Sequence, residues 1–271
     1  LQSIEKTKHT SQNVNNYLRK EINKWEKEID NYHRIYGKIK LSKAQRRQLD
    51  KGETLFKESV YLFEKNEFSE AQKKIDLAQE YLPEVLNYSK SVLNDYFKNY
   101  PHWENWINQT LANSRKQNNT CVIIDKYNRK CYVYKKGNMI QSFDIELSEN
   151  WLGNKKKQGD KNTPEGIYKI TKKKSNGDSK FHKALLLNYP NESDKERFQL
   201  NKQNGIVNKN DKIGSLIEIH GHGGKGYDWT DGCIALTNND MDKLFDYCNI
   251  GTEVSIVGSM LSFEKIIEKY N

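Results

Sequence analysis

Residues 219–238 read IHGHGGKGYDWTDGCIALTN, and this stretch joins an apolar strand end to a glycine-rich turn. The strand is expected over Leu216–His220, and Cys233 follows His220 after thirteen residues. A thiol is a weak nucleophile until a base removes its proton, and a histidine titrates near neutral pH. The pair supplies what thiol-dependent acyl transfer needs.

Side chains alternate along a strand, so Ile217 and Ile219 are predicted to face the core while Glu218 and His220 face the other way. Gly232 permits the close backbone approach that a carbonyl substrate needs, and nearby N–H groups can face an oxyanion. We therefore predict Cys233 as nucleophile, His220 as base and Gly232 as part of the catalytic turn. The alternative for each residue alone is a hydrogen-bonded strand-end histidine and a small buried cysteine.

Outward from this turn, the C-terminal half has the composition of a mostly β domain. CVIID and CYVYKK, separated by KYNRK, predict a hairpin of β-branched and aromatic residues. Short helices are expected after Thr237 and over Ser262–Tyr270. Further strands are predicted over Met139–Leu147, Gly166–Lys173, Ala184–Leu187 and Thr252–Val257.

The N-terminal part is predicted to be helical. One apolar stripe at helical spacing comprises Val14, Leu18, Ile22, Trp25, Ile29, Tyr32 and Tyr36. Ser42 with Gln45, and Ser69 with Gln72, are capping-box pairs that predict two further helix starts. Pro83 should kink or break the third helix, and Pro101 can open a fourth.

These patterns predict an α+β chain with two parts. Residues 1–117 would form a helical bundle or stacked helical hairpins as an accessory domain, and residues 118–271 a mixed, mostly β catalytic domain. The polar stretch Ser114–Thr120 is expected to be the linker.

Composition narrows the classes of partner. The 271 residues carry a net charge of +9, but lysines alternate with acidic residues along both halves, which favours a solvated surface over a nucleic-acid footprint. No apolar run approaches the eighteen residues of a transmembrane helix. The chain starts at Leu1, which suggests processing, and a signal peptide or lipid anchor upstream would not be visible.

A zinc site is the main alternative chemistry. His220 and His222 have a familiar ligand spacing, and Cys233 with Asp228 or Asp231 could complete the set. The surrounding glycines argue for a flexible loop, and the four cysteines form no CxxC pair. We therefore expect no metal and no cofactor.

Other loop residues have two interpretations each. Tyr227 and Trp229 could contact substrate or act as a lid, whereas Trp229 could simply pack the turn. Glu218 could orient the imidazole of His220, or a backbone carbonyl could do so. Lys161 and Lys155–Lys157 could attract substrate carboxylates, although a solvated face is the more common role of such lysines.

The same residues resemble a known family. Asp228–Leu236 (DWTDGCIAL), preceded by Ile219-His220-Gly221, resembles the active-site segment of YkuD-type L,D-transpeptidases. GDKNTPEGIYKI (159–170) resembles the family's TPxG strand entry, and ALLLNYPNESD (184–194) matches a stretch of one branch. The likeness spans about Thr120–Gly258. The common pattern has histidine where Asp231 stands and arginine where Ala235 stands.

The resemblance implies a cysteine acyltransferase of cell-wall biogenesis and cell shape, placed in the periplasm or otherwise outside the cytoplasm. Cys233 would attack a peptidoglycan stem peptide with His220 as base, and N–H groups around Gly232 would hold the oxyanion. The thioester would pass to an amine on a second stem or a protein, or to water in a carboxypeptidase or amidase. A degenerate cell-wall-binding module is the non-catalytic alternative. The expected substrate-binding residues are His222, Tyr227, Trp229, Thr230 and Asp231.

Overall fold

A computed structural model describes residues 2–175 and 177–270 of the chain, so the expectation about Leu1 lies outside the described residues. The chain divides into two compact units. One comprises the residues up to Asp95 together with those from Phe263 onward, and the other comprises Tyr96–Ser262. The sequence indicated a boundary near residue 117 between an accessory and a catalytic domain. The division into accessory and catalytic domains stays a proposal.

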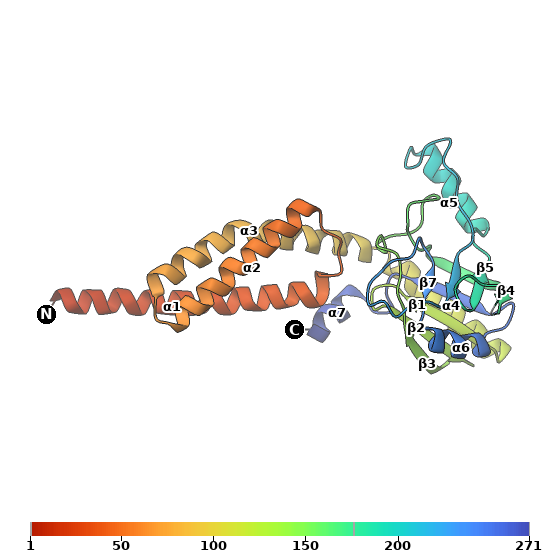
Figure 1. The fold of residues 1–271 in the computed structure, drawn as a ribbon, viewed down its shortest axis with the longest axis horizontal. Coiled ribbons are helices and arrows are strands. Elements are labelled where there is room, and N and C mark those ends of the chain that lie inside the picture. Colours follow the sequence, from red (N-terminus) through yellow and green to blue (C-terminus); the bar gives the residue numbers. More distant parts are fainter. Residues whose placement is uncertain (1, 176, 271) are drawn as a thin grey trace. The chain divides into compact units, whose positions relative to one another are not determined.

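The first unit is helical, as predicted (Figure 1). Leu18, Ile22 and Trp25 of the apolar stripe are buried. Polar bonds also join the helices: Gln48 donates from Nε2 to the Tyr81 carbonyl at 3.1 Å. The elements are α1 (Gln2–Asn31), a π-helical turn (Tyr32–Tyr36), α2 (Lys43–Glu64), α3 (Phe68–Phe97, of which Tyr96 and Phe97 belong to the second unit) and α7 (Phe263–Tyr270).

The predicted helix boundaries have mixed outcomes. The Ser42–Gln45 capping box is confirmed at the start of α2. Ser69 does not cap a helix start, because α3 begins one residue earlier, at Phe68. Of the kink or break expected at Pro83, the break does not occur, because α3 continues through the proline to Phe97. Buried apolar side chains on both sides of Pro83, Leu82 and Val85 among them, favour the helical path.

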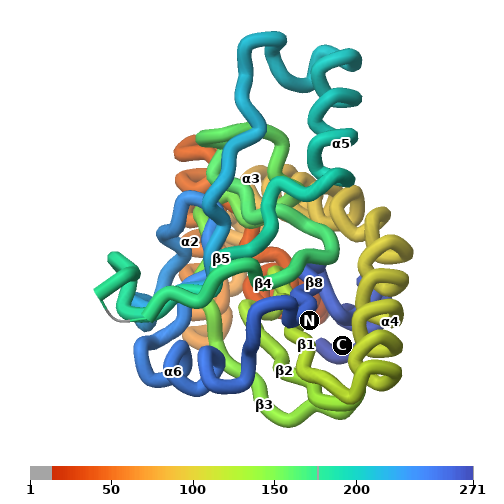
Figure 2. The backbone as a smooth tube through the Cα atoms, turned by 90° about the vertical axis from the view of Figure 1, so that its right-hand side faces the viewer, coloured from red at the N-terminus to blue at the C-terminus, as the bar shows by residue number. Residues whose placement is uncertain are grey.

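The second unit is built on one eight-stranded mixed sheet with the strand order β3-β2-β1-β8-β4-β5-β6-β7. Helix α4 contacts β8 and β1, and α6 contacts β5 (Figure 2). The strands are β1 (Thr120–Asp125), β2 (Lys130–Lys135), β3 (Asn138–Asp144), β4 (Gly166–Lys174), β5 (Ala184–Leu187), β6 (Glu218–His220), β7 (Ile234–Ala235) and β8 (Glu253–Val257). The helices are α4 (Tyr100–Gln117), α5 (Glu192–Gln203) and α6 (Asn238–Tyr247).

A buried ion pair anchors the start of β4 beneath α4. Lys126 donates to Glu165 at 2.7 Å, and both side chains are almost fully buried. The Tyr96 hydroxyl and the Trp103 indole N–H donate to the same carboxylate at 2.7 and 3.0 Å. Because a buried charge is stable only when paired and hydrogen-bonded, this cluster holds the TPEG turn in one position.

The hairpin of β1 and β2 is confirmed, whereas two local predictions need correction. The segment Ser114–Thr120 is no linker: α4 runs to Gln117, and Ser114 is buried and donates to the Asn119 carbonyl. Strand β6 begins only at Glu218, because Leu216 has a left-handed φ of 60°. Helix α5 was not predicted, since its polar sequence has no apolar stripe. Within residues 2–175 and 177–270, no helix is long and apolar enough to cross a bilayer.

Candidate active site

Strands β6 and β7 place the two candidate catalytic residues on neighbouring segments of the sheet. The hydrogen bond that the structure gives the Cys233 sulfur goes to the Leu216 carbonyl and not to the imidazole. The two strands pair in parallel, with Ile219 opposite Ile234 and His220 opposite Ala235. This register puts Cys233, directly before β7, beside Glu218. His220 therefore lies about 7 Å farther along the sheet and one strand, about 4.8 Å, across, a separation that two side chains can bridge.

The turn before Cys233 requires glycine. Gly232 has a φ of +123°, which residues with a Cβ rarely adopt. A Cβ built there would lie 2.8 Å from the Asn162 carbonyl oxygen, closer than such atoms pack. The Thr230 hydroxyl closes the turn by donating to the Cys233 carbonyl at 2.7 Å. Within the described chain, the Cys233 N–H has no hydrogen-bond acceptor, so it is available to a ligand.

The sulfur of Cys233 is half-buried and protonated at neutral pH. Burial raises the pKa of the thiol to about 11, against the opposing effects of the Glu218 N–H and of Lys155. The thiol is 3.6 Å from the Leu216 carbonyl oxygen, to which it donates. Cys121, Cys131 and Cys248 are buried, so the Cys233 side chain is more accessible than those of the other three cysteines.

His220 is held as a neutral base. Its Nδ1 lies 2.7 Å from the Gly221 carbonyl oxygen, and because a carbonyl only accepts, Nδ1 carries the proton and Nε2 keeps a lone pair. Burial lowers the pKa of the imidazole, although this hydrogen bond opposes the shift. Phe181 stacks on the ring at 4.4 Å between centroids, which fixes its plane.

The sequence left two partners open for the imidazole, Glu218 and a backbone carbonyl. The structure has the backbone carbonyl, whereas the Glu218 carboxylate is paired with Lys174 of β4. The polar side of β6 is also covered: Glu218 and His220 are buried together with Ile217 and Ile219.

The loop between the strands is tied to the sheet at Asp228. Its carboxylate accepts from the Leu147 N–H at 2.8 Å and from the Arg129 guanidinium at 2.6 Å. Trp229 donates from its indole to Glu146 at 2.7 Å, and its ring lies 5.9 Å from that of His220. Trp229 therefore packs the loop and also borders the imidazole. The sequence offered no signal for Asp228 as an anchor, because Arg129 is far away in the chain.

The remaining predicted contact residues differ in exposure. His222, Tyr227 and Asp231 are exposed, whereas Thr230 is buried and uses its hydroxyl inside the turn. His222 has a left-handed φ of 63°, so it does not continue the strand alternation with His220. The described residues contain no cluster of three or more His, Cys, Asp or Glu that could hold a metal ion.

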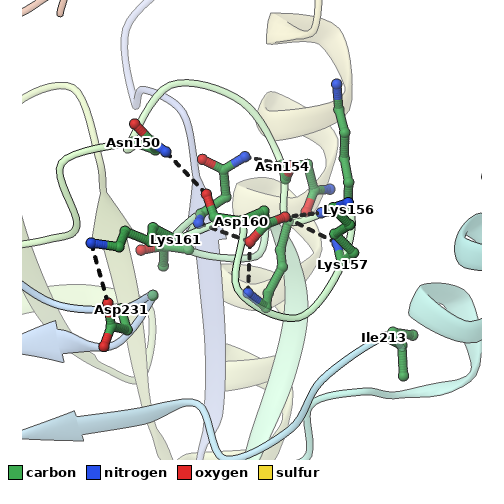
Figure 3. A network of polar contacts seen from close by, with 12 residues as sticks. Asn150, Asn154, Lys156, Lys157, Asp160, Lys161, Ile213 and Asp231 are labelled. Atoms are coloured by element: carbon green, nitrogen blue, oxygen red, sulfur yellow. Dashed lines mark hydrogen bonds and ion pairs between the residues drawn. The ribbon is translucent and has the colours of Figure 1, made fainter. Parts of the chain in front are cut away.

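A loop centred on Asp160 lies against the Cys233 turn, through Asn162 beside Gly232 and Lys161 beside Asp231. Asp160 accepts from the N–H groups of Lys156, Lys157 and Asn162 and from Nζ of Lys155, at distances of 2.6–3.0 Å (Figure 3). These bonds lower the pKa of the carboxyl, although burial raises it. Lys155 is buried in this network, so it does not belong to a solvated face. Lys161 reaches Asp231 at 3.8 Å.

Substituting Gly232 with alanine should damage the site without removing any catalytic atom. The Cβ would meet the Asn162 carbonyl and force the turn out of its left-handed φ, so we expect product formation to fall by about 10²-fold or more. Steady-state assays on the variant measure this. Gly226→Ala, in the same loop and with no atom within 4 Å of the added Cβ, is the control, and equal losses in both variants would contradict the steric argument.

The second unit matches a known family. The family model for the YkuD L,D-transpeptidase catalytic domain covers residues 119–256, which include β1 to β7, all of β8 except its last residue, and the Cys233 turn. The chain belongs to the YkuD family. YafK of Escherichia coli K12, provisionally named an L,D-transpeptidase, is 29% identical over 110 residues. That match covers 40% of this chain and 37% of YafK, so the chain spans little more than a third of this relative.

Solved structures similar to this chain include two bacterial proteins with partial overlap. The helical cell shape determining protein Pgp2 of Campylobacter jejuni is 26% identical, with a TM-score of 0.41 and coverage of 53% of this chain and 49% of Pgp2. Bd1075 of Bdellovibrio bacteriovorus is 22% identical, with a TM-score of 0.39 and coverage of 56% and 52%. Helix α4 and everything before it lie outside the residues that the YkuD model matches.

Proposed function

We propose that this YkuD domain transfers acyl groups of peptidoglycan stem peptides through a thioester on Cys233. The observation that supports the proposal best is the pairing of β6 with β7, which brings a half-buried thiol beside a strand ending in a neutral, oriented imidazole. Membership of the family supports the choice of substrate class.

The first half-reaction forms the thioester. Nε2 of His220 removes the thiol proton as Sγ of Cys233 attacks the carbonyl carbon of the third, L-centred residue. The C–S bond forms, and the negative charge on the carbonyl oxygen is stabilised by N–H groups of the turn, with that of Cys233 as the first candidate. The C–N bond to the D-amino acid then breaks, and the imidazolium returns its proton to the leaving amine.

The second half-reaction releases the acyl group. An amine of another stem or of a protein attacks the thioester carbonyl, gives its proton to His220, and expels the Cys233 sulfur, which recovers a proton. Water in place of the amine gives a carboxypeptidase or amidase. We propose that the exposed side chains of Tyr227, His222 and Asp231 contact the peptide. Trp229 would line the site beside the imidazole, and Thr230 would hold the Cys233 turn in shape.

The proposal extends to location and to the helical unit. Peptidoglycan lies outside the cytoplasm, so the chain would work in the cell envelope, and the charge pattern gives no reason to expect nucleic acid as a partner. The helical unit would tune access or partner choice and would not take part in the chemistry.

Incubation with purified muropeptides tests this function. Mass spectrometry should detect crosslinked dimers if an amine is the acceptor, or trimmed tripeptides if water is. Unchanged muropeptides that are nevertheless retained by the protein would support the binding-module alternative instead. Loss of product after chelation, with stoichiometric zinc in the active protein, would favour the zinc-hydrolase alternative.

The pH dependence of Cys233 alkylation should report the neutral thiol. Iodoacetamide reacts with the thiolate, so a pKa of about 11 predicts a rate that climbs about tenfold per pH unit from pH 7 to pH 10 without a plateau. Peptide mass spectrometry of the Cys233 fragment measures the rate. A plateau already below pH 8 would contradict this, because it would mean that His220 holds the sulfur as a resting thiolate.

A further inference from the structure

A cavity lies in the same unit as the Cys233 turn, among α4, β4 and the start of α5, and its lining contains no part of that turn. Its volume is about 530 Å³, within the range of about 300–1,000 Å³ that is typical of small-molecule sites. Asn105, Gln109 and Asn113 line it from α4. Their spacing of four residues puts the three amides on one face of the helix. Figure 2 shows α4 running beside the strands of this unit.

Most charged groups around the cavity are already paired. Asp194 forms an ion pair with Arg197 and accepts from the Tyr168 hydroxyl at 3.0 Å. Asn113 donates to both carboxylate oxygens of Glu253 at 3.3 Å. Lys169 is exposed at the cavity and adds one positive charge. The cavity therefore offers little net charge to an anionic or cationic ligand.

Three lining groups make no hydrogen bond to the protein. Within residues 2–175 and 177–270, these are the side-chain amides of Asn105 and Gln109, both exposed to solvent at the mouth of the cavity, and the indole N–H of Trp106. Trp106 is half-buried, and its ring lies 6.4 Å from that of His102. An amide both donates and accepts, and an indole combines an apolar face with a donor.

This combination suits one class of ligand. A sugar ring presents an apolar C–H face that stacks on an aromatic ring, and hydroxyl and acetamido groups that both donate and accept. We propose that the cavity binds an oligomer of N-acetylated amino sugars, with Trp106 against a ring and Asn105 and Gln109 on its polar groups. If the proposed function holds, the natural source would be the glycan strand that carries the stem peptide, and α4 would grip the strand while Cys233 acts on the peptide.

The test uses the full chain and N,N′,N″,N‴-tetraacetylchitotetraose, which has no stem peptide and so does not involve Cys233. Titration by calorimetry or NMR should show saturable binding. Asn105→Ala and Gln109→Ala should each weaken it by about 2- to 10-fold, the range for one lost hydrogen bond, and the double variant by more. Asn108→Ala is the matched control, because Asn108 is an exposed amide on the same helix that does not line the cavity.

Three results would overturn the proposal. The first is the absence of saturable binding up to about 10 mM sugar, above the millimolar range of weak binding. The second is binding that Asn105→Ala and Gln109→Ala leave unchanged. The third is binding that uridine displaces as well as the sugar does, because the pocket would then select a flat base. Cys233→Ala should leave the titration unchanged. Failure of the acyl-transfer proposal and failure of this one are thus distinguishable.

Discussion

Cys233→Ala should abolish product formation from muropeptides, by about 10⁴-fold or more, while the protein still folds and still binds the peptide. The expectation follows from the chemistry, since alanine cannot form the thioester and no neighbouring group replaces a nucleophile. Stability should change little, because the side chain is half-buried and donates one weak bond, to the Leu216 carbonyl. Product analysis beside thermal melting measures both quantities.

Cys248→Ala is the matched control for this experiment. Cys248 is fully buried, and burial raises the pKa of its thiol to about 12, so it is not expected to react. A variant without Cys233 that retains turnover, or equal losses in both variants, would contradict the assignment of the nucleophile.

Lys126→Met should produce the largest loss of stability. It would leave the Glu165 carboxylate buried without its cation, which costs about 3–5 kcal/mol of unfolding free energy when one partner of a buried pair is removed. Urea unfolding of the variant measures the loss. The double variant Lys126→Met/Glu165→Gln should recover part of it, because no unpaired charge then remains in the core.

An exposed pair provides the comparison for that prediction. Lys195 and Glu192 lie on the surface at the start of α5, where water screens their attraction, so Lys195→Met should change the stability little. If Lys126→Met unfolded at the same urea concentration as Lys195→Met, the buried pair would not hold the TPEG turn as described.

Local patterns predicted most of the elements but not the packing between them. The alternation of β-branched residues predicted β1 and β2, and the Ser42–Gln45 pair predicted the start of α2. No break occurs at Pro83, because the preference of a single residue is outweighed by buried neighbours along α3. Helix α4 was predicted, but its place on the sheet depends on long-range contacts such as the bond of Trp103 to Glu165, which no local pattern reveals.

In the candidate site, too, the sequence predicted the local features but not those that depend on the fold. The sequence predicted the turn around Cys233 and the strand end at His220, because the residues that define each feature are close together in the chain. The tautomer of His220, by contrast, depends on a carbonyl whose direction only the folded loop sets. Likewise, the anchoring of Asp228 by Arg129 joins segments that sequence spacing cannot relate.

The thioester itself is the species that decides between chemistry at Cys233 and all other interpretations. The protein is incubated with a tetrapeptide stem, quenched in acid and digested, and the fragments are sequenced by tandem mass spectrometry. We expect the tripeptide acyl group on the fragment that contains Cys233, with the adduct absent from Cys233→Ala. Turnover accompanied by an adduct on another residue, or by no dependence on Cys233, would contradict the proposed mechanism.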